Sequence, residues 1–113
     1  MSGITTHVLD TSRGCPAAGV AVALERAVDF DPGWQVVARG TTDADGRVSD
    51  LLSSTPDEGR YRLRFDTGAY FSAAGEAGFY PEVSVTFTVS LHEEHYHVPL
   101  LLSPFGYSTY RGS

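Results

Sequence analysis

Alternation of polar and apolar residues with a period of two dominates this sequence and restricts most of it to β-strands. Residues 60–66, Arg-Tyr-Arg-Leu-Arg-Phe-Asp, place three arginines on one side of an extended chain and three apolar side chains on the other. Residues 82–89, Glu-Val-Ser-Val-Thr-Phe-Thr-Val, repeat the pattern with every second residue, from Val83 to Val89, facing inward. Such alternation is typical of antiparallel strands with one face in the core and one in water.

Several further segments have the composition of strands, and one does not. Residues 19–25 alternate large and small apolar side chains, which fits a more central strand. Residues 68–75 are rich in alanine, lack alternation and end at a glycine, as a short helix does. The remaining strands are expected at 5–9, 35–41, 47–50, 95–102 and 107–110, with turns at 13–16, 31–33, 43–46 and 56–59. About eight short strands separated by frequent turns predict an all-β sandwich with one short helix.

Length and composition limit the class of protein. The 113 residues, 42% hydrophobic and 19% charged, suffice for one globular core, and no linker divides them, so we expect a single domain over residues 1–113. A formal net charge of −6 without a basic stripe argues against a nucleic-acid partner. The chain has no secretory signal, no apolar run near the roughly 20 residues that span a bilayer, and only one cysteine, Cys15. We therefore expect a cytoplasmic protein without a disulfide or a membrane partner.

Three of the four histidines crowd into residues 92–97. On a strand, His95 and His97 point to one face, while the apolar residues that alternate with them fill the opposite, core face. His97 therefore needs either water or a second surface against its imidazole, and the same holds for His7 in the first strand. His95 can equally be a solvated residue at the end of its strand.

Histidine and arginine side chains are the candidates for chemistry. A neutral imidazole can accept a proton from water or give one to a leaving nitrogen near pH 7. Arginine presents a planar fork of donors to carbonyl groups and oxyanions. Arg47, just after a turn, and Arg111, near the chain end, are candidates for this role, although each can also be a simple surface charge. The sequence has no Gly-x-Ser-x-Gly elbow, phosphate loop or dinucleotide fingerprint, so a serine triad has no local support.

The same histidines allow a metal site as an alternative. His95 and His97 lie two residues apart on one face, which suits zinc, with His7, His92 or Glu93 as further ligands. This spacing is common on β-strands and carries little specificity. A site without a metal therefore remains the prediction.

The end of the chain carries a recognisable motif. Residues 95–113 read His-Tyr-His-Val-Pro-Leu-Leu-Leu-Ser-Pro-Phe-Gly-Tyr-Ser-Thr-Tyr-Arg-Gly-Ser, which resembles the closing signature of the 5-hydroxyisourate hydrolases, the transthyretin-related enzymes of urate breakdown. Residues 4–11, Ile-Thr-Thr-His-Val-Leu-Asp-Thr, with Gly-Cys-Pro-Ala at 14–17, resemble that family's first strand and turn. Residues 42–47, Thr-Asp-Ala-Asp-Gly-Arg, and 79–83, Phe-Tyr-Pro-Glu-Val, are similar to two further family segments. The terminal Tyr-Arg-Gly-Ser is the most specific part, because transthyretin itself lacks it.

The resemblance implies a fold, an assembly and a site. It implies a transthyretin-like sandwich of eight strands and a homotetramer, a dimer of dimers with active sites at the dimer–dimer interface, which would supply the second surface that the histidines need. The family's catalytic positions fall on His7, Arg47 and His97. Its terminal motif, which would contact substrate, falls on Tyr110, Arg111, Gly112 and Ser113.

The implied reaction is the hydrolytic opening of the six-membered ring of 5-hydroxyisourate to 2-oxo-4-hydroxy-4-carboxy-5-ureidoimidazoline. His7 and His97 would orient and deprotonate water and later protonate the departing nitrogen, and Arg47 would hold a substrate carbonyl. No metal or organic cofactor is implied, because water is the nucleophile and the substrate is an activated ring amide. Two alternatives are a transthyretin-like carrier of a hydrophobic ligand, which would not need the polar cluster, and a structural β-sandwich module of a surface assembly, which the free thiol disfavours.

Overall fold

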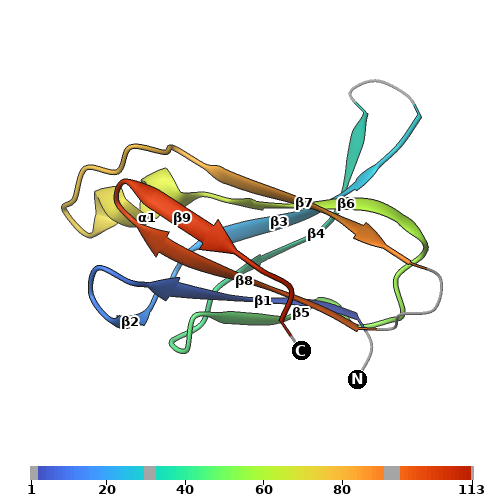
Figure 1. Ribbon diagram of the computed structural model, residues 1–113, viewed down its shortest axis with the longest axis horizontal. Helices are drawn as coiled ribbons and strands as arrows, with labels where there is room; N and C mark the ends of the chain where they lie inside the picture. Colours follow the sequence, from blue (N-terminus) through green and yellow to red (C-terminus); the bar gives the residue numbers. More distant parts are fainter. Residues whose placement is uncertain (1–2, 30–32, 91–94, 113) are drawn as a thin grey trace.

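Two β-sheets and one short helix make up the part of the chain that the structure describes (Figure 1). The computed structural model describes residues 3–29, 33–90 and 95–112. Within these ranges one sheet has the order β2-β1-β8-β9, with β5 also paired to β1, and the other has the order β4-β3-β6-β7. The elements of this part of the chain are β1 (Gly3–Asp10), β2 (Cys15–Pro16), β3 (Ala21–Ala27), β4 (Trp34–Thr41), β5 (Arg47–Leu52), β6 (Gly59–Phe65), α1 (Thr67–Ala73), β7 (Val83–Val89), β8 (His95–Ser103) and β9 (Gly106–Thr109).

The predicted all-β architecture is confirmed. Each of the eight expected strands and the expected helix is present, and the observed ends lie within about two residues of the expected ones. Residues 15–16 differ, because they were expected within a turn but form β2, which pairs with the end of β1. Gly14, with a φ of 69°, lets the chain turn back tightly enough for this pairing.

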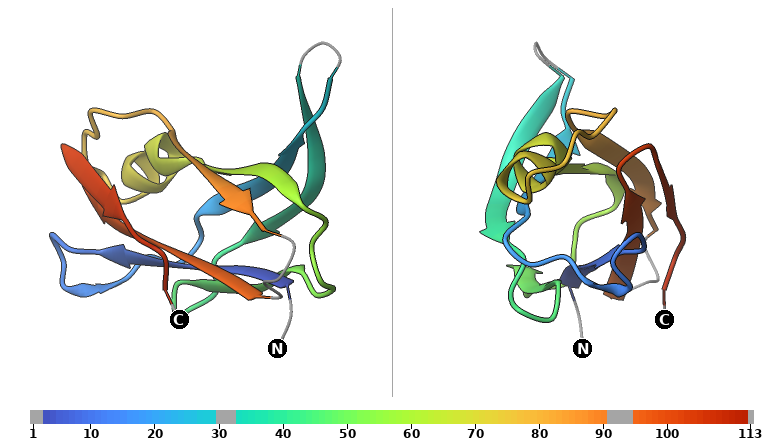
Figure 2. Two further views of the ribbon diagram at one scale, coloured as in Figure 1. Left: turned by 45° about the vertical axis from the view of Figure 1, so that its right-hand side comes forward. Right: turned by 90° about the vertical axis from the view of Figure 1, so that its left-hand side faces the viewer.

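The core lies between the two sheets, and the two views of Figure 2 show them on opposite sides of the molecule. The three alternating apolar residues of β6 are buried, as the sequence predicts. β7 departs from the expectation: Val83 and Val89 are buried, but Val85 and Phe87 are only half-buried. β7 is the last strand of its sheet, so no neighbouring strand covers its free side.

Three segments far apart in the sequence meet in the β1-containing sheet. β1 and β8 run parallel in register, so that Thr5 pairs with His97. On the other side of β1, the antiparallel β5 places Arg47 opposite His7. These pairings bring the histidines and the arginine singled out above to one region of the sheet.

A buried carboxylate ties α1 to the end of β1. Asp10 is fully buried and accepts hydrogen bonds from the Tyr70 hydroxyl at 2.7 Å and from the backbone N–H groups of Ser12 and Arg13 at 3.1 and 3.2 Å. Burial by itself raises the pKa of Asp10, but these hydrogen bonds outweigh it and leave the pKa below its ordinary value. Burial, together with the bond to Asp10, raises the pKa of Tyr70 to about 12.

Among the residues that the structure describes, none of the helical segments has both the length and the apolar character needed to span a membrane.

We expect Asp10→Asn to lower the free energy of unfolding by about 2 kcal/mol at pH 7, because a neutral amide replaces the charged acceptor of buried hydrogen bonds. The stabilisation by Asp10 is present above the ordinary pKa of 3.8 and is lost as the pH falls through the lower folded value, so the two proteins should converge in acid. Urea unfolding at pH 7 and at about pH 3 measures this difference. Asp57→Asn is the matched control, because its side chain is 80% exposed, and an equal loss in both variants would contradict the role of Asp10.

Candidate active site

A pocket of about 260 Å³ opens on the sheet that contains β1, β5 and β8. β8 contributes His95 and His97 from one face of the strand, as the alternation predicts. β5 contributes Arg47 at its first residue, and β1 contributes Thr5. The remaining lining residues are Thr6, Val48 and Ser49. The pocket thus unites two of the three predicted catalytic residues, Arg47 and His97.

His97 is half-buried and is held at one ring nitrogen. Its Nδ1 lies 2.8 Å from the hydroxyl oxygen of Thr5, its cross-strand neighbour. Among the described residues no hydrogen bond engages its Nε2. Burial lowers the pKa of His97 below its ordinary value, and the charges of Arg47, His7 and His95 lower it further. At neutral pH His97 is therefore an uncharged imidazole with one nitrogen positioned and the other available.

A tight turn sets the backbone from which Arg47 extends. The Asp43 side chain accepts hydrogen bonds through Oδ1 from the backbone N–H groups of residues 45 and 47, at 2.9 and 3.0 Å. Gly46 has a φ of 75°, and a Cβ at this position would lie 2.3 Å from a carbonyl oxygen of β1. The turn therefore requires glycine, and it delivers Arg47 opposite His7.

His7, the third predicted catalytic residue, lies beside the pocket and not in its lining. Its Nε2 is 2.9 Å from the backbone carbonyl oxygen of Asp45 in the same turn. Because a carbonyl oxygen can only accept a hydrogen bond, Nε2 carries a proton and donates it to this oxygen. The structure places His7 next to Arg47 and close enough to lower the pKa of His97.

The C-terminal tail divides between two places. Gly112 lies against His97: its N–H donates to the His97 carbonyl oxygen at 2.8 Å, and a Cβ at 112 would approach the imidazole Cδ2 to 2.6 Å. Tyr110 and Arg111 instead line a separate pocket of about 260 Å³ beside β7, where the Arg111 guanidinium lies 4.6 Å from the centre of the Tyr96 ring. The predicted Ser113 falls outside the described residues. Within one chain, the described tail supports His97 but does not bring Tyr110 or Arg111 into its pocket.

Two residues of the site are missing from the sequence-based prediction. Thr5 was expected only as part of the first strand, and its contact with His97 depends on the parallel pairing of β1 with β8, which no local pattern reveals. Asp43 was expected only as a turn residue, although an Asp side chain in a turn often accepts a hydrogen bond from the backbone N–H two residues on, as Asp43 does from Asp45. Both residues position the predicted ones.

The described part of the chain contains no set of side chains that could bind a metal ion as the alternative requires. Within residues 3–29, 33–90 and 95–112, no group of three or more His, Cys, Asp or Glu side chains is arranged to hold a metal ion. His92 and Glu93, which the alternative needs, lie outside these ranges. A zinc site would therefore depend on those two residues.

Comparison with known proteins identifies the family. The model of the HIUase/Transthyretin family matches residues 4–112. The 5-hydroxyisourate hydrolase of Salmonella typhimurium is 48% identical over 111 residues, which cover 97% of this chain and 80% of that protein. The structure of Klebsiella pneumoniae 5-hydroxyisourate hydrolase superposes with a TM-score of 0.85 at 37% identity, covering 97% of this chain and 98% of that one. Sea bream transthyretin in complex with thyroxine superposes with a TM-score of 0.90 at 35% identity, covering 96% and 93%. The chain belongs to the HIUase/Transthyretin family.

Proposed function

We propose that this chain hydrolyses 5-hydroxyisourate to 2-oxo-4-hydroxy-4-carboxy-5-ureidoimidazoline, a step of urate breakdown. The observation that carries the proposal is the neutral His97 imidazole beside the Arg47 guanidinium in one pocket. The names of the Salmonella and Klebsiella relatives support the same activity. The free and exposed Cys15 supports the reducing cytoplasm as the compartment.

In the proposed reaction, Nε2 of His97 takes a proton from water as the water oxygen attacks the carbonyl carbon of the ring amide. The Arg47 guanidinium stabilises the oxyanion that develops on the carbonyl oxygen. The bond between this carbon and the ring nitrogen then breaks, and the imidazolium returns its proton to the departing nitrogen. His7, whose ring is held by the bond from Nε2 to the Asp45 carbonyl oxygen, orients the water. One water is consumed, one carboxyl group forms, and neither a metal nor an organic cofactor takes part.

The proposal includes a homotetramer, a dimer of dimers in which a second copy closes each site. Arg47 is exposed and the pocket is open within a single chain, so a facing copy would supply the missing wall. Large apolar side chains are available for such contacts, since Phe79 is 69% and Phe105 is 74% exposed. In this assembly the tail residues Tyr110 and Arg111 contact a neighbouring copy or line its site.

A ligand carrier is the second candidate, because sea bream transthyretin bound to thyroxine has a very similar fold. The pocket of this chain argues against apolar carriage, since two histidines, an arginine, two threonines and a serine line it. The two threonines are buried and hydrogen-bonded within the chain, but the exposed Arg47 guanidinium would lose water against an apolar ligand without gaining a partner. The polar lining therefore favours hydrolysis.

A labelled substrate tests the proposal. With the ring amide carbonyl carbon of 5-hydroxyisourate labelled with carbon-13, NMR should show conversion of the amide signal to a carboxylate signal. At a hundredfold excess of substrate over protein, a hydrolase converts all of it faster than buffer does, whereas a carrier protects or retains at most one equivalent. Conversion at the buffer rate, together with stoichiometric binding of thyroxine, would replace the proposal with the carrier.

We expect Gly112→Ala to lower turnover by roughly tenfold to a hundredfold, because the added methyl group displaces the His97 ring, and misplacement by about 1 Å costs rates of this order. Gly106→Ala is the matched control, since a Cβ there meets only the Ser103 hydroxyl, at 3.8 Å. Steady-state kinetics of both variants, with the His97 ring signals followed by NMR, measure the effect. Unchanged His97 signals and normal turnover in Gly112→Ala would contradict this role of the tail.

Treatment with a chelator is expected to leave turnover unchanged, because Thr5 holds Nδ1 of His97 and water is activated without a metal. The comparison is between the purified protein before and after incubation with EDTA, each assayed with and without added zinc. Loss of turnover that zinc restores would contradict the metal-free reaction and would favour a zinc site with His92 or Glu93 among its ligands.

A further inference from the structure

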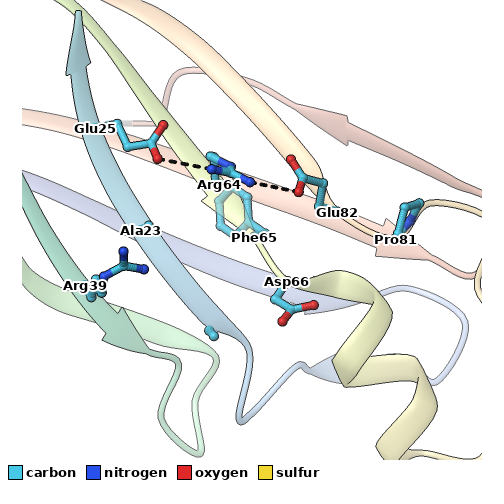
Figure 3. A pocket seen from close by; sticks show the side chains of 9 residues that line it. Ala23, Glu25, Arg39, Arg64, Phe65, Asp66, Pro81 and Glu82 are labelled. Atoms are coloured by element: carbon cyan, nitrogen blue, oxygen red, sulfur yellow. Dashed lines mark hydrogen bonds and ion pairs between the residues drawn. The ribbon is translucent and has the colours of Figure 1, made fainter. Parts of the chain in front are cut away.

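A second hollow, of about 290 Å³, lies on the other sheet, over β3 (Figure 3). Its floor is formed by Ala21 and Ala23, which point away from the core while the residues that alternate with them are buried. In register, Ala23 lies between Arg39 of β4 and Arg64 of β6. The side chains of Ala21 and Ala23 are only methyl groups, so the space above β3 stays open. Larger side chains at these two positions would fill it.

One wall of this hollow is a connected set of ion pairs. Arg64 donates hydrogen bonds to Glu25 at 3.3 Å and to Glu82 at 2.9 Å, as Figure 3 shows. Glu25 is only 4% exposed and also pairs with Arg62. The hydrogen bonds to Glu82 and Glu25 raise the pKa of Arg64, and the bond to Arg64 lowers the pKa of Glu82. The charges of this wall therefore satisfy one another, and the wall is held in place.

Two charged groups at the hollow retain binding capacity. Arg39, on the opposite wall, makes no hydrogen bond or ion pair within the described residues. Asp66 accepts the Ala69 N–H through Oδ1 at 3.1 Å, and its other oxygen has no partner in the same part of the chain. A simple anion would meet the carboxylates of Asp66 and Glu82, and a simple cation would meet Arg39. The arrangement suits a molecule that carries an anionic group and hydrogen-bond donors together.

We propose that this hollow binds a small carboxylate that also carries N–H donors, the class that includes α-amino acids and ureido acids. The carboxylate pairs with the Arg39 guanidinium, the N–H groups donate to Asp66, and the carbon skeleton lies on Ala21 and Ala23. The volume is at the lower end of small-molecule sites, about 300 Å³, which suits a compact ligand. The hollow and the His97 pocket belong to different sheets, so occupancy of one does not block the other.

N-carbamoylglycine is the probe, because it joins a carboxylate to a ureido group. Titrated into the nitrogen-15-labelled full chain, it should shift the backbone amide signals of Ala21, Ala23 and Arg39 saturably and leave the His97 amide unchanged. Acetate and urea each carry one half of the pattern, and each should bind at least about tenfold more weakly, the effect of losing about 1.4 kcal/mol of contact.

Three variants locate the site. Arg39→Gln should weaken N-carbamoylglycine binding by about tenfold or more, because the charged fork is lost. Ala23→Leu should abolish binding by filling the hollow, with circular dichroism to verify the fold. Arg60→Gln is the control that should keep full affinity, since Arg60 is an exposed arginine on β6 of the same sheet and does not line the hollow.

Several results would overturn the proposal. One is the absence of saturable shifts at Ala21, Ala23 and Arg39 in the unmodified protein. Another is an Arg39→Gln protein that binds N-carbamoylglycine with the same affinity as the unmodified protein. Acetate binding as tightly as N-carbamoylglycine would make the hollow a plain anion site and would remove Asp66 from it.

Discussion

Replacing His97 by asparagine is expected to reduce the turnover of 5-hydroxyisourate by about a hundredfold or more, the usual scale of general acid–base catalysis. An asparagine side chain has a similar size and can still bond to the Thr5 hydroxyl, so the backbone pairing of β1 with β8 should persist. It cannot exchange a proton near neutral pH, so the water loses its base. The measurement is kcat with pure protein, alongside circular dichroism and the mass of the assembly by light scattering.

His95→Asn is the matched control for this variant. His95 lies two residues away on the same face of the same strand and lines the same pocket. It has no assigned proton transfer, so its replacement should cost much less turnover than that of His97. Near-normal turnover in His97→Asn, or an equal loss in the two variants, would remove His97 from its proposed role.

Arg47→Gln is expected to lower kcat/KM by roughly a hundredfold to a thousandfold, the range measured when a donor to a developing oxyanion is removed. It should also move the acid limb of the pH profile to higher pH. The positive charge of Arg47 is one of the causes that lower the pKa of His97, so its removal lets the imidazole protonate at higher pH. Protonated His97 cannot act as a base, so the Arg47→Gln protein should lose activity at a higher pH than the unmodified protein does.

Arg60→Gln controls for the loss of one exposed arginine, because Arg60 lies on β6 in the other sheet. The kcat/KM of each protein would be measured between about pH 5 and pH 9. An Arg47→Gln protein with normal kcat/KM and an unmoved acid limb would show that Arg47 neither stabilises the oxyanion nor acts on His97.

The strands and their inward faces could be predicted from the sequence because alternation is a local property. The burial of Tyr96, Val98, Leu100 and Leu102 opposite the histidines follows directly from it. The half-burial of Val85 and Phe87 could not be predicted in this way, because it depends on β7 being the last strand of its sheet. Likewise β2 required the pairing partner that the end of β1 provides.

The candidate site was predictable in its residue types and less so in its contacts. His97 and Arg47, to which the family resemblance had pointed, line one pocket, and their catalytic roles stay a prediction. The contact of Thr5 with His97 requires knowledge that β1 and β8 run parallel. Predicting the role of Gly112 requires knowledge that the tail passes over the His97 imidazole. This follows from the pairing of residue 112 with His97, which the amino-acid composition does not reveal.

The most direct test of the central claim is the ultraviolet absorbance decay of freshly generated 5-hydroxyisourate, with and without the purified protein, in matched buffer. The substrate also hydrolyses unaided, so the ratio of the two rates is the quantity of interest. The proposed chemistry predicts strong acceleration, proportional to protein concentration and absent with His97→Asn. Decay at the buffer rate in the presence of a folded, assembled protein would contradict it.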